Sequence, residues 1–275
     1  MILYGNEVAK AIDEKSMALA KINKPVLAIV RVGNKPSDLS YERGLMKRCE
    51  KIGVEVRNVI MDEKVSKEQF YSKLDSLNQD TEIHGILIFR PLPVYLDNEK
   101  ARNYISSSKD VDGCTNESLA GVFTNTKVGY APCTAQAVME CLDHYDIDIT
   151  SKNVVIVGRS LVVGKPLSMM MCSKNATVTL CHTKTKDLKE ITKKAEIVVV
   201  ATGQMESMDD TYFSKGQTVI DVGINYNEIK QKLCGDILYE KVEPVVDNIT
   251  PVPKGIGSIT NSILVYHVCQ AANQN

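Results

Sequence analysis

The segment YERGLMKRC, residues 41–49, places a phenol, a carboxylate and three cations in a stretch whose pattern is helical. A helix has about 3.6 residues per turn, so the side chain that shares a face with Tyr41 one turn later belongs to Leu45. Lys47 follows six residues after the tyrosine and lies near the opposite side. The neighbour of the tyrosine on its own face is therefore an aliphatic residue and not a cation.

A second informative segment is VVIVGRSLVVGKP, residues 154–166. A buried strand ends at Gly158 and a helix opens at Gly164, which is the geometry that exposes backbone N–H groups to a pyrophosphate. The spacing G-x-x-x-x-x-G differs from the standard G-x-G-x-x-G, so a plain glycine-assisted turn fits the pattern equally well. Arg159 after this strand and Thr183 after the next could receive a 2′-phosphate, although Arg159 also fits a solvated loop arginine.

Two carboxylates stand two residues apart in KDVDG, residues 109–113. In an extended segment they would share one face, whereas in a loop one of them can point into a cleft. Taken alone, the pattern is more typical of a solvated turn. The loops PCTA (132–135) and TPVPKGIGSIT (250–260) are either plain connections or places where the backbone approaches a flat ligand closely.

Strand-like apolar runs alternate with helical stretches along most of the chain. The strand-like runs cover residues 25–33, 54–61, 83–93, 153–160, 176–182, 195–203 and 217–225. Helical patterns cover residues 66–80 with a Ser66 cap, 134–145 with Thr134 as N-cap, and 164–175. Near-continuous apolar strands separated by helices indicate parallel strands covered on both faces. We therefore predict an α/β protein of two domains, the second a doubly wound sheet, with the boundary near residues 144–150.

Composition excludes several classes of protein. With a net charge of −1, the 275-residue chain lacks the basic footprint of a nucleic-acid-binding protein. Its apolar runs are too short for a membrane helix, and its first residues lack the pattern of a signal peptide. Eight cysteines without a CxxC pair fit a reducing cytoplasm, and the four histidines show no metal-binding spacing. We expect a soluble cytoplasmic protein without a structural metal.

Eleven short segments, taken in order, resemble the methylenetetrahydrofolate dehydrogenase/cyclohydrolase family along nearly the whole chain. They include GNEVAK, VGNKPSDLSY, KRCEKIGVEV, KDVDG, VVIVGRSLVVGKPL, ATVTLCHTKT and VIDVGIN. The resemblance implies a folate-binding domain over residues 1–145 with 253–275, the last helix returning to it, and a Rossmann domain over residues 146–252. It also implies a homodimer formed through the Rossmann domain, a folate substrate, and NADP as cofactor with NAD as the alternative. Members oxidise 5,10-methylenetetrahydrofolate to 5,10-methenyltetrahydrofolate, and most then hydrolyse the product to 10-formyltetrahydrofolate.

The resemblance also assigns roles to individual residues. Tyr41 matches the tyrosine that stacks on the aminobenzoate of folate, and Asp112 matches the aspartate that hydrogen-bonds the pterin. Both are therefore expected in the catalytic site. The positions that match the cofactor contacts are Gly158, Arg159, Ser160, Gly164, Thr183 and Ile224. The positions that match the folate-side loop are Pro251, Pro253, Gly255 and Gly257.

Two departures from the family pattern change the expected chemistry. The family has its catalytic lysine four residues after the tyrosine, where this chain has Leu45. Cys49 and Gly53 fix the register of this comparison without a gap. The glutamine that supports the lysine is replaced by Phe89, which is followed by Arg90. Both members of the lysine–glutamine pair are therefore replaced by apolar residues.

The joint loss predicts a dehydrogenase with weak or absent cyclohydrolase activity. Removing a hydride mainly requires orientation of two rings, whereas hydrolysis requires proton transfer. The sequence leaves two alternatives open. One is a bifunctional enzyme in which Arg90, Lys47 or Lys254 moves the protons. The other is a non-catalytic protein that binds folate and nucleotide, with which the altered loop KGIGS (254–258) is compatible.

Overall fold

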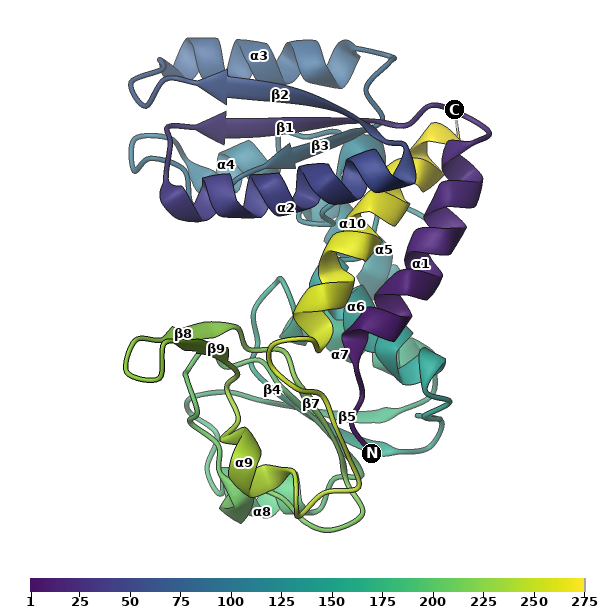
Figure 1. Cartoon of the computed structure of the whole chain (residues 1–275), viewed down its shortest axis with the longest axis vertical. Coiled ribbons are helices and arrows are strands. Elements are labelled where there is room, and N and C mark those ends of the chain that lie inside the picture. The colour runs from purple at the N-terminus through teal and green to yellow at the C-terminus, as the bar shows by residue number, and fades with distance from the viewer. Residues whose placement is uncertain (275) are drawn as a thin grey trace. The chain divides into compact units, whose positions relative to one another are not determined.

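The computed structural model describes residues 1–274, which form two compact units (Figure 1). Unit 1 contains residues 1–10 and 134–260, and unit 2 contains residues 11–133 and 261–274. The predicted domains were 1–145 with 253–275, and 146–252. The limits of the units differ from these because α6 (Cys133–His144) lies in unit 1 from Thr134 onward. In addition, α1 (Gly5–Ala20) and α10 (Ile256–Ala272) contribute residues to both units.

Unit 2 is built on a parallel sheet with the strand order β2-β1-β3. The strands are β1 (Val26–Val32), β2 (Glu55–Met61) and β3 (Gly85–Ile88). Every residue of the central strand β1 is buried, as its near-continuous apolar sequence predicts for a strand covered on both faces. Ile29 of β1 pairs with Asn58 of β2 and with Leu87 of β3. The carboxyl ends of the strands therefore lie at one edge of the sheet.

The helices of unit 2 follow local signals in the sequence. They are α2 (Pro36–Ile52), α3 (Lys67–Gln79), α4 (Asn98–Arg102) and α5 (Asn116–Thr124), with a 3₁₀ turn η1 (Ser107–Lys109). Ser66 begins α3 with a capping box, because its hydroxyl accepts from the Gln69 N–H and the Gln69 side chain accepts from the Ser66 N–H. Phe70 and Leu74 of α3 pack in the same core cluster as Val30 of β1.

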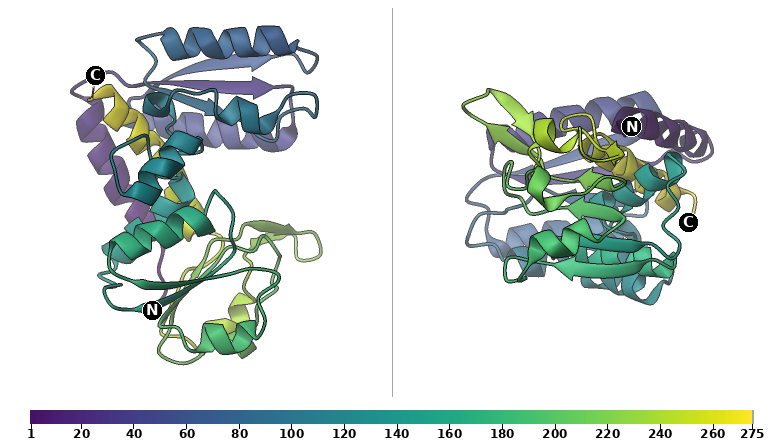
Figure 2. Two further views of the ribbon diagram at one scale, coloured as in Figure 1. Left: turned by 180° about the vertical axis from the view of Figure 1, so that it is seen from behind. Right: turned by 90° about the horizontal axis from the view of Figure 1, so that it is seen from below.

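Unit 1 contains the predicted doubly wound sheet, with the parallel strand order β10-β7-β6-β4-β5. The strands are β4 (Asn153–Val157), β5 (Thr177–Cys181), β6 (Ile197–Val200), β7 (Thr218–Asp221) and β10 (Asn248–Ile249). Figures 1 and 2 show α7 (Gly164–Ser173) on one side of this sheet and α8 (Leu188–Lys193) with α9 (Tyr239–Val242) on the other. The 3₁₀ turn η2 (Asp210–Tyr212) precedes β7. An antiparallel hairpin of β8 (Asn225–Asn227) and β9 (Lys232–Cys234) follows β7.

One predicted helix start was misplaced. Helix α6 (Cys133–His144) begins one residue before Thr134, so the threonine lies within the first turn and is not the N-cap. The sequence signal was misread because Pro132, which directly precedes the helix, is not a typical capping residue, whereas threonine is. Within residues 1–274, no helix is both long enough and apolar enough to cross a membrane.

Candidate active site

Helix α2 presents Tyr41 at the surface of unit 2 and buries the residue one turn later. Tyr41 is 40% exposed, whereas Leu45 is fully buried. Phe89, which directly follows β3, is buried and lies edge-on to Tyr41 with the ring centroids 5.5 Å apart. Lys47 is exposed on the helix. The position one turn after Tyr41 and the position directly after β3 therefore carry no group that can transfer a proton.

The next residue, Arg90, forms an ion pair with Asp112 beside this tyrosine. Arg90 Nη2 lies 3.1 Å from Asp112 Oδ2, and the two side chains are 26% and 31% exposed. Burial raises the pKa of the Asp112 carboxyl, and the Arg90 guanidinium opposes this shift. Burial, followed by the negative charge of Asp112, raises the pKa of the Tyr41 phenol far above its usual range. Tyr41 is therefore protonated at neutral pH and cannot act as a base there.

The two carboxylates of KDVDG have opposite environments. Asp110 is fully buried and accepts hydrogen bonds from the Cys114 N–H (3.0 Å), the Thr115 N–H (2.7 Å) and the Ser118 hydroxyl (2.6 Å). These groups open helix α5, so Asp110 fixes the loop to that helix. Gly113 then turns the chain with φ +68°. Asp112 is left partly exposed beside Arg90.

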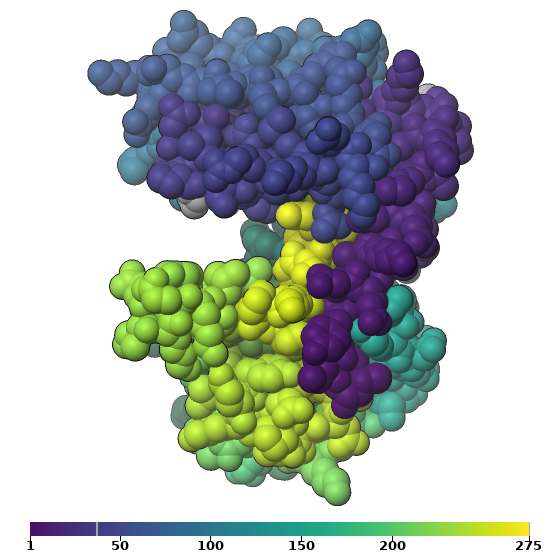
Figure 3. Space-filling view, viewed as in Figure 1, coloured from purple at the N-terminus to yellow at the C-terminus, as the bar shows by residue number. Residues whose placement is uncertain are grey.

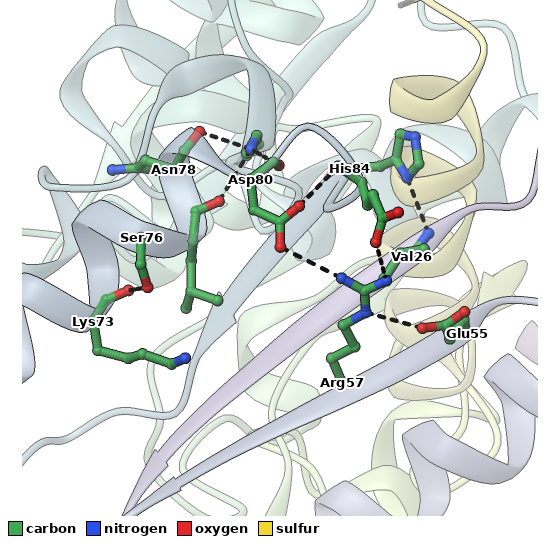
Figure 4. A network of polar contacts seen from close by, with 11 residues as sticks. Val26, Glu55, Arg57, Lys73, Ser76, Asn78, Asp80 and His84 are labelled. Atoms are coloured by element: carbon green, nitrogen blue, oxygen red, sulfur yellow. Dashed lines mark hydrogen bonds and ion pairs between the residues drawn. The ribbon is translucent and has the colours of Figure 1, made fainter.

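Lys109 anchors the same loop to the end of α3. Its Nζ donates to the carbonyls of Leu77 (3.0 Å), Asn78 (2.7 Å) and Asp80 (2.6 Å), which the end of the helix leaves without helical partners. Asp80 is itself held by Arg57, which also pairs with Glu55, as Figure 4 shows. The start of KDVDG is therefore tied to the frame of unit 2.

Val111, between the two carboxylates, is held by a buried pair of side chains. Its carbonyl accepts from Cys133 Sγ at 3.2 Å and lies 2.8 Å from His267 Nδ1. Burial lowers the pKa of His267 to about 4, so its imidazole is neutral at physiological pH and carries a proton on Nδ1 toward the carbonyl. These contacts fix the backbone directly before Asp112.

A buried ion pair that the sequence analysis did not identify fixes α2 against β1. Arg31 Nε lies 2.7 Å from Glu42 Oε2, and Arg31 also donates to Asn34 Oδ1 at 2.6 Å. Both charged residues are buried. Glu42 directly follows Tyr41, so this pair helps to orient the helix that presents the tyrosine. An arginine within an apolar strand was the signal that could have revealed it.

A cavity of about 330 Å³ lies at the carboxyl ends of β4, β5 and β6 in unit 1. Its wall includes the predicted cofactor residues Gly158, Arg159, Ser160 and Thr183, and also His182, Gln204 and Tyr212. Gly158 has φ +132°, and a Cβ there would lie 2.1 Å from the Ala201 carbonyl oxygen. Gly164 is not part of the wall; a Cβ there would lie 1.8 Å from the Gly158 carbonyl oxygen, so it permits close packing of α7 on the turn.

A smaller cavity of about 190 Å³ in unit 1 brings together the other predicted loop residues. Its wall includes Ile224, Pro251, Pro253, Gly255 and Gly257. A Cβ on Gly257 would lie 2.5 Å from Ile224 Cδ1, so the glycine allows the two loops to approach each other. The predicted folate residues thus fall in both units, since Tyr41 and Asp112 belong to unit 2.

Two buried carboxylates that the sequence analysis missed support both cavities of unit 1. Asp221, at the end of β7, accepts from the backbone N–H groups of Gly223, Asp236 and Ile237 at 2.9 to 3.1 Å. Burial raises the pKa of Asp221 to about 7, and these hydrogen bonds oppose the shift. Asp236 accepts from the Thr202 N–H at 2.6 Å. The pair therefore joins the loop after β6 to the loop that carries Ile224.

Comparison with known proteins places this geometry in a family. Residues 3–112 match the catalytic domain of tetrahydrofolate dehydrogenase/cyclohydrolase, and residues 132–275 match its NAD(P)-binding domain. The bifunctional protein FolD of Clostridium botulinum strain Langeland is 48% identical over 279 residues, which cover 100% of this chain and 99% of the relative.

Solved structures agree with these matches along the full chain. The crystal structure of the bifunctional enzyme FolD from Campylobacter jejuni has a TM-score of 0.96 and 33% identity, and the match covers 100% of this chain and 99% of that one. The Trypanosoma brucei enzyme, solved with NADP and an inhibitor, has a TM-score of 0.91 and 27% identity, with coverage of 100% and 97%. Residues 134–260 of the matched NAD(P)-binding domain lie in unit 1. The chain therefore belongs to the tetrahydrofolate dehydrogenase/cyclohydrolase family.

Proposed function

We propose that this protein oxidises 5,10-methylenetetrahydrofolate to 5,10-methenyltetrahydrofolate by hydride transfer to NADP, and hydrolyses the product weakly or not at all. The observation that supports weak or absent hydrolysis is the fully buried Leu45 together with the buried Phe89. Tyr41 serves as the surface on which the aminobenzoate stacks, and Asp112 accepts hydrogen bonds from the pterin. The loop 251–257 supplies further contacts to the folate.

The two reactions differ in what they demand from the protein. Hydride removal leaves a methenyl cation that the folate nitrogens stabilise, so the protein need only orient the two rings. Hydrolysis adds water and breaks a C–N bond, and both steps move protons. Around the folate site the phenol of Tyr41 stays protonated, and an arginine such as Arg90 makes a poor base. Lys47 is exposed and away from the tyrosine's face. None of them suits the work of a general base.

The decisive experiment supplies methylenetetrahydrofolate and NADP to the purified protein and follows both cofactor reduction and the folate product. We expect NADPH to form and methenyltetrahydrofolate to accumulate. The control variant is Gly158→Val, whose side chain would collide with the Ala201 carbonyl and close the cofactor turn. Absence of NADPH formation in the native protein would contradict the proposal and favour a non-catalytic binding protein.

The preference for NADP depends on Arg159 at the mouth of the cofactor cavity. Arg159 is exposed beside Ser160 and Thr183, where it can meet a 2′-phosphate. Hydrogen bonds to a charged group contribute about 1.5–3 kcal/mol, so Arg159→Ala should lower the ratio of kcat/KM for NADP over NAD by about 10–100-fold. Steady-state kinetics with both cofactors measure this ratio. Lys193→Ala, at an exposed position of α8, is the matched control and should leave the ratio unchanged.

We also propose that the protein is a homodimer formed through the β8–β9 hairpin of unit 1. This hairpin stands at the surface in lime green in Figure 3 and exposes Tyr226 (55%), Ile229 (95%) and Leu233 (41%). Several large apolar side chains exposed on one hairpin are typical of an interface between protein chains. Ile229→Asp should shift the molar mass measured by light scattering toward that of the monomer, whereas Ile22→Asp, at another exposed isoleucine, should not. An unchanged mass for Ile229→Asp at low concentration would contradict the proposed interface.

The cysteines support a cytoplasmic location, which we propose on this basis. All eight are free thiols in the structure, at positions 49, 114, 133, 141, 172, 181, 234 and 269. Most of them are buried. Free thiols in this number are typical of a reducing compartment.

A further inference from the structure

The ion pair between Arg90 and Asp112 is made through one contact only. Arginine and carboxylate groups frequently pair through two parallel hydrogen bonds, but here the contact is that of Nη2 with Oδ2 at 3.1 Å. Among the residues that the structure describes, Asp112 Oδ1 and the Nη1 and Nε groups of Arg90 have no hydrogen-bond partner. One acceptor and several donors are therefore available side by side, next to the exposed ring of Tyr41.

We infer that Arg90 is a specificity-determining residue that reads the pterin ring together with Asp112. This inference rests on the proposed function, in which Asp112 accepts hydrogen bonds from the pterin. The pyrimidine edge of a pterin presents the 2-amino group and N3–H as donors, followed by the carbonyl oxygen O4 as an acceptor. Asp112 can accept from the two donors, and an N–H of Arg90 can donate to O4. The pair then matches three adjacent polar groups of the ligand.

A role in folding alone does not explain this pair. Both side chains are about one quarter to one third exposed, and ion pairs that remain in contact with water contribute little to stability. The loop is fixed by Asp110 and Lys109 without help from Arg90. A guanidinium at this place has more to contribute to a bound ligand than to the folded chain.

The test compares two ligands that differ around position 4 of the pterin, which Arg90 is inferred to read. Tetrahydrofolate carries O4 and N3–H, whereas 4-amino-4-deoxytetrahydrofolate carries an amino group at C4, which cannot accept from arginine, and an unprotonated N3. The change at N3 concerns Asp112, which every variant retains, so the contribution of Arg90 is read from the difference in the ratio between the native protein and each variant. Isothermal titration gives the dissociation constant of each ligand with the native protein and with Arg90→Leu, Arg90→Lys and Arg43→Leu. Arg43 is an exposed arginine of α2 and serves as the matched control.

We expect Arg90→Leu to shift the ratio of the two dissociation constants by about 10–100-fold in favour of the amino ligand, as the loss of a hydrogen bond from a charged donor predicts. Arg90→Lys should retain part of the discrimination, and Arg43→Leu should leave the ratio unchanged. A merely structural role would weaken the binding of both ligands equally. An unchanged ratio in Arg90→Leu would therefore overturn this inference and leave the proposed function standing. If the native protein bound neither ligand, the proposed function would fall and the inference with it.

Discussion

Leu45→Lys combined with Phe89→Gln is expected to raise the hydrolysis of methenyltetrahydrofolate by about 10²–10⁴-fold over the native chain, the usual contribution of a general acid or base. Position 45 is fully buried one turn after Tyr41, so a lysine there would be desolvated and its pKa lowered toward neutrality. Position 89 lies against Tyr41, and an amide there could hydrogen-bond the amine. Leu45→Lys alone should restore little, because the amine would lack this partner.

The measurement follows the decay of added methenyltetrahydrofolate against its uncatalysed rate. The control variant combines Leu45→Met with Phe89→Gln, which keeps position 45 apolar at a similar volume and should show no gain. Because a buried lysine costs stability, thermal unfolding must show that the double variant is folded at the assay temperature. A native rate far above the uncatalysed one would contradict the proposed loss, and a folded double variant without any gain would contradict the role assigned to these positions.

If positions 45 and 89 have lost a proton-transfer pair, as we propose, the rest of the site indicates what the chain retains. A general decline in function would affect the cofactor turn and the pterin contact as well as the proton-transfer pair. The structure instead keeps a cavity lined by Gly158, Arg159 and Ser160, and it keeps Asp112 fixed by Val111 and Lys109. This pattern supports the loss of one reaction with retention of the other. The methenyl product would then pass to a separate hydrolase in the same cell.

Much of the fold could be predicted because the central parallel strands, such as β1 and β6, are buried along their whole length. The runs at 54–61 and 176–182 match the edge strands β2 and β5 to within one residue at either end. The predicted run 83–93 extends beyond β3, because ladder pairing ends at Ile88 while the following residues, apart from Arg90, remain apolar through the PLP turn. Hydrophobicity reports burial, and it does not report where hydrogen bonding between strands stops.

The polar framework of the site was much harder to predict. The pattern of KDVDG shows two equivalent acids, and only the turn at Gly113 and the donors at the start of α5 decide which of them is buried. The Arg31–Glu42 pair depends on how α2 lies on β1. Such contacts depend on packing between elements, and sequence spacing does not specify that packing. The roles of Tyr41 and Asp112 came from the family resemblance and not from periodicity.

The difference between the two acids gives the second large prediction, which compares Asp110→Asn with Asp112→Asn. Asp110→Asn places an amide NH₂ among two N–H donors and a hydroxyl in a fully buried site. Hydrogen bonds to a buried charge contribute about 1.5–3 kcal/mol each, and the amide oxygen can replace only part of them. The free energy of unfolding should therefore fall by about 2–4 kcal/mol, as measured by urea denaturation followed by circular dichroism.

Asp112→Asn should have the opposite profile, because its carboxylate is partly exposed and makes one contact, with Arg90. We expect less than about 1 kcal/mol of change in the free energy of unfolding. The KM for methylenetetrahydrofolate should rise by about 10–100-fold, because an amide cannot accept from both pterin donors. Each variant is the control for the other, since the two carry the same chemical change two residues apart. Equal destabilisation by both, or an unchanged KM in Asp112→Asn, would show that the structural and ligand-binding roles are not divided between the two acids in this way.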